Sequence, residues 1–183
     1  FYKIASYELL WDDLLVSVAC TGKPVVLSTG MATLEEVYKA VKVLVNAGCQ
    51  ELTLLHCISG YPTLPSDCNL AAIETLRRVC NFPVGWSDHS VNPSVIFRAV
   101  HAWGASMIEF HLDLDSQGEE YKMGHCWLPC QIGPVIHAIQ EGFKADGSGQ
   151  KIPSQCELEE REWRSDPSDG LRPSLKVREL WRG

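Results

Sequence analysis

The sequence predicts an α/β fold: a TIM (β/α)8 barrel of the aldolase type, present as its C-terminal part of about five βα units. Near-continuous apolar runs, which are typical of strands buried on both faces, start at positions 2, 25, 52, 84 and 107, so 23 to 32 residues apart. The segments between them carry apolar residues at helical spacing. The predicted strands are Tyr2–Ser6, Val25–Thr29, Leu52–Cys57, Val84–Asp88 and Met107–His111.

Polar side chains gather at the carboxyl ends of these predicted strands, and the strand starts carry almost none. A (β/α)8 barrel assembles its active site at that face from several strands, whereas a doubly wound sheet binds ligands mainly at one switch point. Contributions from all five strands therefore favour the barrel. The polar residues are Lys3, Ser6, Ser28, Thr29, His56, Ser59, Ser87, Asp88, His89, Glu109 and His111.

Helix signals fit the same repeat. Thr33 and Glu36 form a capping box, and Asn92-Pro93 opens a helix-length segment that ends near Trp103. After His111, residues 113–125 are polar and predict a long functional loop, followed by a helix from Pro129 to Phe143. We expect residues 1–144 to form the partial barrel and residues 145–183 a polar C-terminal tail or linker. Because a barrel needs about 250 residues, about three βα units are expected before Phe1.

Length, charge and cysteine content exclude some classes of partner. The chain has 183 residues, a net charge of −7 and no apolar run of membrane-spanning length, so neither a nucleic-acid surface nor a membrane partner is expected. Eight cysteines without a CxxC pair and without a secretory signal predict reduced thiols in a cytoplasmic protein. His125, Cys126 and Cys130 could begin a zinc site, but no second ligand pair follows at zinc-finger spacing.

His89 and His111 end neighbouring predicted strands that a helix connects. A right-handed crossover makes these strands parallel, so the two imidazoles are expected at the same edge of the sheet. With Asp88 and Glu109 beside them, they could hold one divalent cation. The alternative is that each is an ordinary hydrogen-bonded histidine.

Several longer motifs occur in a specific order. They are KIASYE from Lys3, GKPVVLSTGMAT from Gly22, LLHC from Leu54, Tyr61-Pro62, GWSDH from Gly85 and GASMIEFH from Gly104. Over residues 1–143 the chain closely resembles the sialic acid synthase (N-acetylneuraminate synthase) family, which includes legionaminate and pseudaminate synthases and spore-coat polysaccharide enzymes.

The resemblance implies a transferase that condenses phosphoenolpyruvate with an N-acylated hexosamine such as N-acetylmannosamine. The product is a nine-carbon 2-keto sugar acid for cell-surface polysaccharides, and phosphate is released. It also implies a divalent metal, most of all Mn²⁺ with Mg²⁺ or Co²⁺ as alternatives, and a homodimer in the full-length enzyme. Carried over by position, the metal ligands are His89 and His111, which with Glu8 are the catalytic residues; the substrate-binding residues are Lys3, Ser6, Ser28, Ser59, Tyr61, Ser87 and Glu120.

Two departures bear on the substrate. The loop reads Gly118-Glu119-Glu120 where relatives have Gly-Pro-Asp, and the stretch from Lys122 to Trp127 is unusual. Glu109 and His56 are expected to point toward the site behind the binding residues. Two other functions stay open: a different phosphoenolpyruvate-dependent or metal-dependent aldol-type enzyme, and a non-catalytic remnant of the synthase.

Overall fold

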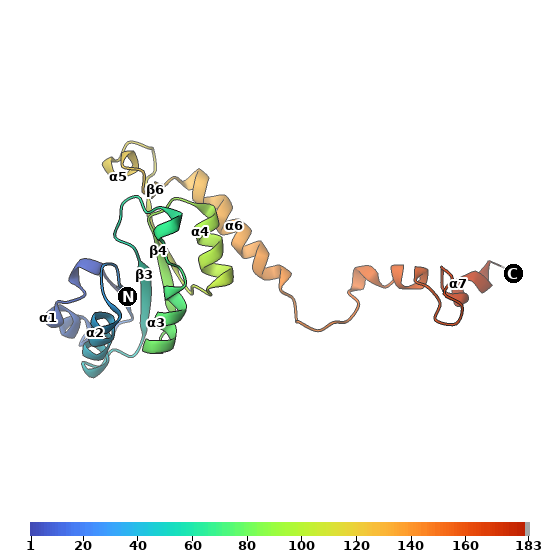
Figure 1. The fold of residues 1–183 in the computed structure, drawn as a ribbon, viewed down its shortest axis with the longest axis horizontal. Coiled ribbons are helices and arrows are strands. Elements are labelled where there is room, and N and C mark those ends of the chain that lie inside the picture. Colours follow the sequence, from blue (N-terminus) through green and yellow to red (C-terminus); the bar gives the residue numbers. More distant parts are fainter. Residues whose placement is uncertain (182–183) are drawn as a thin grey trace. The chain divides into compact units, whose positions relative to one another are not determined.

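The computed structural model describes residues 1–181 (Figure 1). The chain divides into two compact units, Phe1–Gly142 and the segment from Phe143 onward. Among the described residues, no helix is both long and apolar enough to span a bilayer. All eight cysteines lie within the described residues as free thiols, and three of them are exposed: Cys20, Cys130 and Cys156.

The first unit is built on one sheet of six parallel strands in the spatial order β1-β2-β3-β4-β5-β6, which is also their order in the sequence. Five of them match the predicted strands within a few residues. Two-residue β6 was not predicted, because it is too short to show a periodicity. The strands are β1 Tyr2–Ile4, β2 Val25–Ser28, β3 Leu52–Cys57, β4 Val84–Asp88, β5 Ile108–Leu112 and β6 Cys126–Trp127.

Helices connect the strands, and the local signals place their starts. The capping box of Thr33 and Glu36 is present, and the Asn92 side chain accepts a hydrogen bond from the Ser94 N–H. The segment after Asn92 is α-helical over α4 and continues as a π-helical turn. The helices of this unit are η1 Ser6–Glu8, α1 Asp12–Ala19, α2 Leu34–Asn46, η2 Pro65–Asp67, α3 Ala72–Cys80, α4 Pro93–Phe97, η3 Arg98–Ala102 and α5 Glu119–Lys122. The last helix, α6 Pro129–Ala145, begins in this unit and ends three residues beyond Gly142.

Strand order decides where the helices lie. When successive parallel strands are neighbours and every crossover is right-handed, all the helices cover the same face of the sheet. The main core is consistent with this, because it joins buried side chains of α1, α2 and α3 to alternate strand residues: Ile4, Val25, Leu27, Leu52, Leu54, Val84 and Trp86. The fold is thus part of a (β/α)8 barrel, as predicted, with helices outside and the opposite strand face inside.

A second, smaller core lies where β6 and α6 join the sheet. Trp127 of this core donates its indole N–H to the fully buried Asp88 carboxylate at 2.9 Å, and Trp86 of the main core donates to the same carboxylate at 3.0 Å. The carboxylate also accepts from Ser90 Oγ at 2.7 Å and from the Val91 N–H at 3.2 Å. Asp88 therefore ties β4 to β6 and fixes the turn that follows His89.

In the second unit, residues 146–181 form three short helical segments, η4 Gln155–Glu157, η5 Glu160–Trp163 and α7 Leu175–Leu180. It is held by polar contacts more than by an apolar core. The Arg178 guanidinium donates to both carboxylate oxygens of Asp169, and Asp166 accepts from the Leu175 N–H at 2.7 Å. Hydrogen bonds from Ser168 and from the Leu175 and Ser168 backbones lower the pKa of Asp166 to about 2.

Candidate functional site

A pocket of about 320 Å³ opens at the carboxyl ends of β1 to β5. Seven of the residues selected from the sequence line it: Lys3, Ser6, Ser28, Tyr61, Ser87, His89 and His111. They belong to five strands or to the loops that follow them. The sheet therefore brings most of the predicted site together, as expected for the catalytic face of a barrel.

The three other selected residues are not among those that line this pocket. Glu8 lies in the short η1 helix after β1. Ser59 lies in the loop after β3, beside Gly30, where a Cβ built on Gly30 would come within 2.3 Å of the Ser59 Oγ. Glu120 lies on α5 and contacts His111.

One charged network crosses the inner face of the sheet. The Lys3 ammonium lies 3.3 Å from a Glu109 carboxylate oxygen, and the Ser87 hydroxyl donates to the other Glu109 oxygen at 2.7 Å. Lys3 is the sole lysine or arginine among the described residues that line the pocket. An ion pair between Lys3 and Glu109 was one of the alternatives that the sequence left open. The pair holds the Lys3 ammonium in a position where an incoming anion can also contact it.

Two serine hydroxyls near the pocket lack partners. Ser28 Oγ and Ser59 Oγ are buried, and neither has a hydrogen-bond partner in the described part of the chain. Buried polar atoms are normally paired, so unpaired ones call for an explanation such as a ligand or water. The Ser6 hydroxyl accepts from the Gly30 N–H at 2.9 Å. This group of hydroxyls suits a ligand rich in oxygen atoms.

The His89 imidazole is buried and leaves one ring nitrogen free to bind a ligand. It is 3% exposed, and its Nδ1–H donates to the Ile58 carbonyl oxygen at 2.9 Å, because a carbonyl oxygen can only accept. Burial lowers the pKa of His89. The remaining lone pair is on Nε2, the arrangement typical of a metal-ligating histidine held by its other nitrogen. The His89 and His111 rings lie 5.2 Å apart between centroids.

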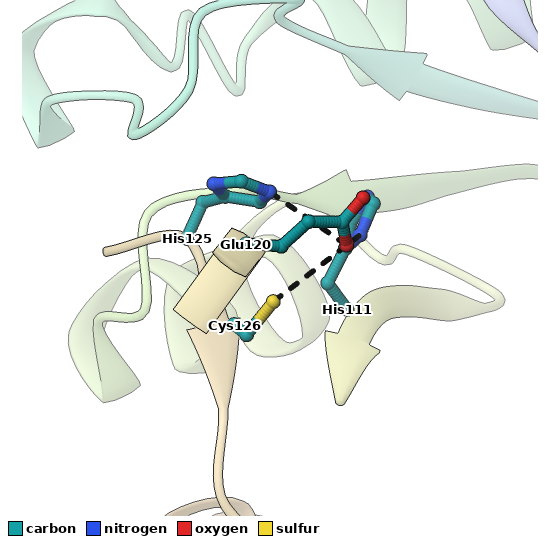
Figure 2. Close-up of side chains that lie close together, drawn as sticks. All are labelled: His111, Glu120, His125 and Cys126. Carbon is teal, nitrogen blue, oxygen red and sulfur yellow. Dashed lines mark hydrogen bonds and ion pairs between the residues drawn. The ribbon is translucent and has the colours of Figure 1, made fainter. Parts of the chain in front are cut away.

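His111 also contacts the loop that follows β5. Its Nδ1 lies 2.9 Å from a Glu120 carboxylate oxygen, and this hydrogen bond is the main cause that lowers the pKa of Glu120. His125 and Cys126 lie on the other side of the same carboxylate (Figure 2). Ligand atoms of His111, Glu120, His125 and Cys126 all lie within 4.8 Å of one another, so this cluster could bind a metal ion.

Two expectations about the site were wrong. Asp88 does not face the cation site, because its carboxylate is taken up by Trp86 and Trp127 on the helix-covered face. His56 lies on that face too, where its Nε2–H donates to the Cys68 carbonyl oxygen at 2.9 Å and burial lowers its pKa. Successive strand residues point to opposite faces, so Asp88 and His56 share the outer face with Trp86, whereas Ser87 and Glu109 share the inner one.

Two residues that line the pocket, Glu109 and Cys57, were not predicted as binding residues from the sequence. Glu109, expected behind the binding residues, lines the pocket itself, and so does Cys57, which was not selected. Cys57 pairs in register with Ser87, so it occupies the same inner layer as that predicted residue. The signal was present in the alternation of β3, but an apolar thiol at the end of an apolar run does not stand out.

Comparison with known proteins gives the family. The NeuB family model matches residues 1–151. The chain is 46% identical to an uncharacterized protein of Methanocaldococcus jannaschii, over 85% of this chain and 46% of the relative. It is 36% identical to the N,N'-diacetyllegionaminic acid synthase of Campylobacter jejuni, over 85% of this chain and 47% of the relative. The chain thus spans about half the length of the curated relatives it matches.

A solved structure agrees. The N-acetylneuraminic acid (sialic acid) synthetase of Leptospira borgpetersenii superposes with a TM-score of 0.74 at 34% identity, covering 91% of this chain and 58% of that one. The resemblance drawn from the sequence motifs, and the barrel fold that it implied, are confirmed. On its strand order, its polar inner face and these relatives, the chain belongs to the NeuB family.

Proposed function

We propose that this chain is part of an enzyme that condenses phosphoenolpyruvate with an N-acylated hexosamine of the N-acetylmannosamine type. A bond forms between the methylene carbon of phosphoenolpyruvate and the aldehyde carbon of the sugar. One water is consumed, phosphate leaves, and a nine-carbon 2-keto sugar acid results. The product belongs to the sialic-acid type used in cell-surface polysaccharides.

The observation that carries the proposal is the composition of the inner pocket. Phosphoenolpyruvate presents a phosphate and a carboxylate on one small molecule, so it needs a cation and several O–H or N–H donors. Lys3 supplies the cation, and the hydroxyls of Ser6, Ser28 and Ser87 lie along the same wall. The unpaired Ser28 Oγ in particular is a donor with no protein acceptor among the described residues.

His89 and His111 are proposed to hold a divalent cation, with Mn²⁺ first and Mg²⁺ or Co²⁺ as alternatives. The residues fit this role, because the Ile58 carbonyl fixes His89 with Nε2 free to coordinate, and the His111 ring is its neighbour. Oxygen ligands from substrate and water beside two imidazoles suit manganese. Such an ion would polarise the sugar aldehyde as a Lewis acid.

The sugar is proposed to lie against Tyr61, which packs on His89 with 4.2 Å between ring centroids. Glu8, Ser59 and Glu120 are proposed to bind its hydroxyls, with Glu8 orienting the aldehyde or moving a proton. Because Glu120 already accepts from His111, a sugar hydroxyl would have to share that carboxylate.

The direct test is to incubate the protein with phosphoenolpyruvate and Mn²⁺ and to measure the inorganic phosphate that is released. We expect release that requires N-acetylmannosamine and is not supported by mannose, which lacks the N-acyl group. Lys3→Met should weaken phosphoenolpyruvate binding, measured by calorimetry, by about tenfold or more because a charge-assisted contact is lost. His56→Gln, on the opposite face of β3, is the matched control and should bind like the parent chain.

Two outcomes would contradict the proposal. Phosphate release that is independent of any aminosugar would indicate a different phosphoenolpyruvate-dependent reaction. A folded chain, checked by circular dichroism, that binds no phosphoenolpyruvate would leave the non-catalytic interpretation.

A further inference from the structure

A second set of metal-capable side chains lies beyond the end of β5, next to the proposed His89–His111 pair. Its members come from three places: His111 from β5, Glu120 from α5, and the pair of Cys126, which begins β6, and His125, which directly precedes it. Figure 2 shows the carboxylate of Glu120 between the two imidazoles and the thiol. The set brings two nitrogens, one oxygen and one sulfur to a single point.

The contacts within this set leave it only partly satisfied. One Glu120 oxygen, Oε2, accepts from His111 Nδ1 at 2.9 Å but lies 3.9 Å from both His125 Nε2 and Cys126 Sγ. A nitrogen–oxygen separation of that length is beyond a hydrogen bond. The carboxylate therefore accepts a hydrogen bond from His111 and a long one from the Cys126 thiol, but none from His125.

His125 turns its Nε2 toward this set, and its Nδ1 lies on the opposite side of the ring (Figure 2). Its side chain is 5% exposed, and its Nδ1 has no hydrogen-bond partner within the described range. Its ring packs edge-on against Tyr61 and His111, each with 5.1 Å between centroids. A buried imidazole held only by ring packing is unusual, because buried polar atoms are normally bonded to protein, water or an ion.

We propose that His111, Glu120, His125 and Cys126 bind one divalent cation of borderline softness, such as Zn²⁺, Co²⁺ or Fe²⁺. The ligand atoms lie within 4.8 Å of one another. In a tetrahedral site, ligands at zinc distances are separated by about 3.3–3.8 Å. The set must therefore contract by up to about 1 Å. Small rotations of the His111, His125 and Cys126 side chains would have to supply this, because Glu120 Oε2 already lies within 3.9 Å of all three.

The thiol determines which cation is preferred. Thiolate and imidazole ligands favour zinc-like ions, whereas Mg²⁺ and Mn²⁺ prefer oxygen ligands. Binding replaces the Cys126 S–H bond with a sulfur–metal bond, and the thiol proton is released to solvent. The proton that His111 Nδ1 donates to Glu120 would move to Nε2, so that Nδ1 can coordinate the ion. The ion would also join α5 and β6 to β5 and so order the loop that borders the pocket. This inference rests on the proposed function only in that both sites use His111.

Titration of the chain with Co²⁺ tests the site, because a cobalt–thiolate bond gives a charge-transfer absorption in the near ultraviolet that imidazole and carboxylate ligands do not. We expect this band to saturate at one equivalent of Co²⁺, to be abolished by Zn²⁺ and to persist in excess Mn²⁺. Cys126→Ser should remove the band and weaken Co²⁺ binding by about tenfold or more. Cys130→Ser, which changes an exposed thiol four residues away, is the matched control and should keep both.

Further variants separate this site from the one in the proposed function. His89→Ala should keep the band, because His89 is not a member of the set. Glu120→Gln changes an exposed side chain, so folding is not at risk, and it should weaken Co²⁺ binding while keeping the band.

Two results would overturn the inference. The first is Co²⁺ binding without the band and sensitive to His89→Ala, which would locate the ion on the His89–His111 pair and leave the proposed function intact. The second is a band that Cys126→Ser does not change.

Discussion

The two ends of the same strands differ more in chemistry than in shape. The carboxyl-end pocket, of about 320 Å³, is lined by Lys3, Glu109, two histidines and several hydroxyls. The amino-end pocket is larger, at about 530 Å³, yet its lining is mostly apolar and includes Phe1, Pro24, Phe82 and Met107. Volume alone would select the wrong end. The difference teaches that the candidate site is recognised by converging polar groups and not by the size of a hollow.

The largest effect should come from removing one imidazole at the carboxyl end. His89→Ala is expected to weaken Mn²⁺ binding by about 100-fold. Gln50→Ala, which alters the lining of the amino-end pocket, should leave it unchanged. Isothermal titration of both variants makes the comparison. Equal Mn²⁺ affinity in the His89 variant and the parent would show that the proposed ion does not use this residue.

A variant of Asp88 tests the helix-covered face of the sheet at the carboxyl end of β4. Asp88→Ala should lower the free energy of unfolding by about 2–5 kcal/mol, because the buried indole N–H groups of Trp86 and Trp127 lose their acceptor. The exposed Asp13→Ala should change it by less than about 0.5 kcal/mol. Urea unfolding followed by tryptophan fluorescence measures both. A neutral Asp88 variant would mean that the carboxylate does not hold β4 to β6.

Alanine variants of Gly85 and Gly30 compare the packing in the middle of β4 with the packing beside the carboxyl-end pocket. A Cβ on Gly85 would lie 2.4 Å from the Met107 carbonyl oxygen and 2.7 Å from Leu55, so Gly85→Ala should destabilise by about 1–3 kcal/mol. A Cβ on Gly30 meets the rotatable hydroxyls of Ser59 and Ser6. Gly30→Ala should therefore cost less stability and act mainly on phosphoenolpyruvate binding.

Gly133 on α6 is the control for both glycine variants. A Cβ there has no described atom within 4 Å apart from its own chain neighbours and the helix backbone. The gain in helix propensity is opposed by the ring of Pro134, which disfavours a helical residue with a Cβ before it, so Gly133→Ala should change the free energy of unfolding by less than about 1 kcal/mol. Thermal and urea unfolding rank the three variants. A Gly85 variant as stable as the parent would contradict the close packing at the centre of the sheet.

The smallest effect concerns pH and the outer face of β3. Burial lowers the pKa of His56 below its ordinary value of 6.5, so the unfolded chain binds its proton more readily than the folded chain. Above about pH 6.5 His56 is neutral in both states and does not lower the free energy of unfolding. Below that value the free energy of unfolding falls as the pH drops. The pKa values of His89 and His125 are lowered in the same direction.

His56→Gln should flatten part of this dependence without removing it, since the other two histidines remain. Unfolding free energies measured at several pH values between about 5 and 7.5 check the slope. A slope that is the same in the variant and the parent would mean that His56 is not held neutral by burial.

Much of the fold could be predicted because its signals are local. The apolar runs Val25–Ser28 and Leu52–Cys57 and the capping box at Thr33 depend on nearby residues, and each lies where the sequence indicated. The short strand Cys126–Trp127 could not be predicted in the same way. Its two residues are a strand only because they pair with His111 and Leu112.

By itself, the sequence determined the family, the order of the strands and the end of the sheet that carries polar groups. It did not determine which face each polar residue takes, because a strand buried on both sides has no polar–apolar alternation to show its parity. Tertiary packing decided that Asp88 and His56 face the helices while Ser87 and Glu109 face the pocket. It also brought Glu120, His125 and Cys126 to His111, since that meeting depends on a loop folding back through the pairing of β5 with β6.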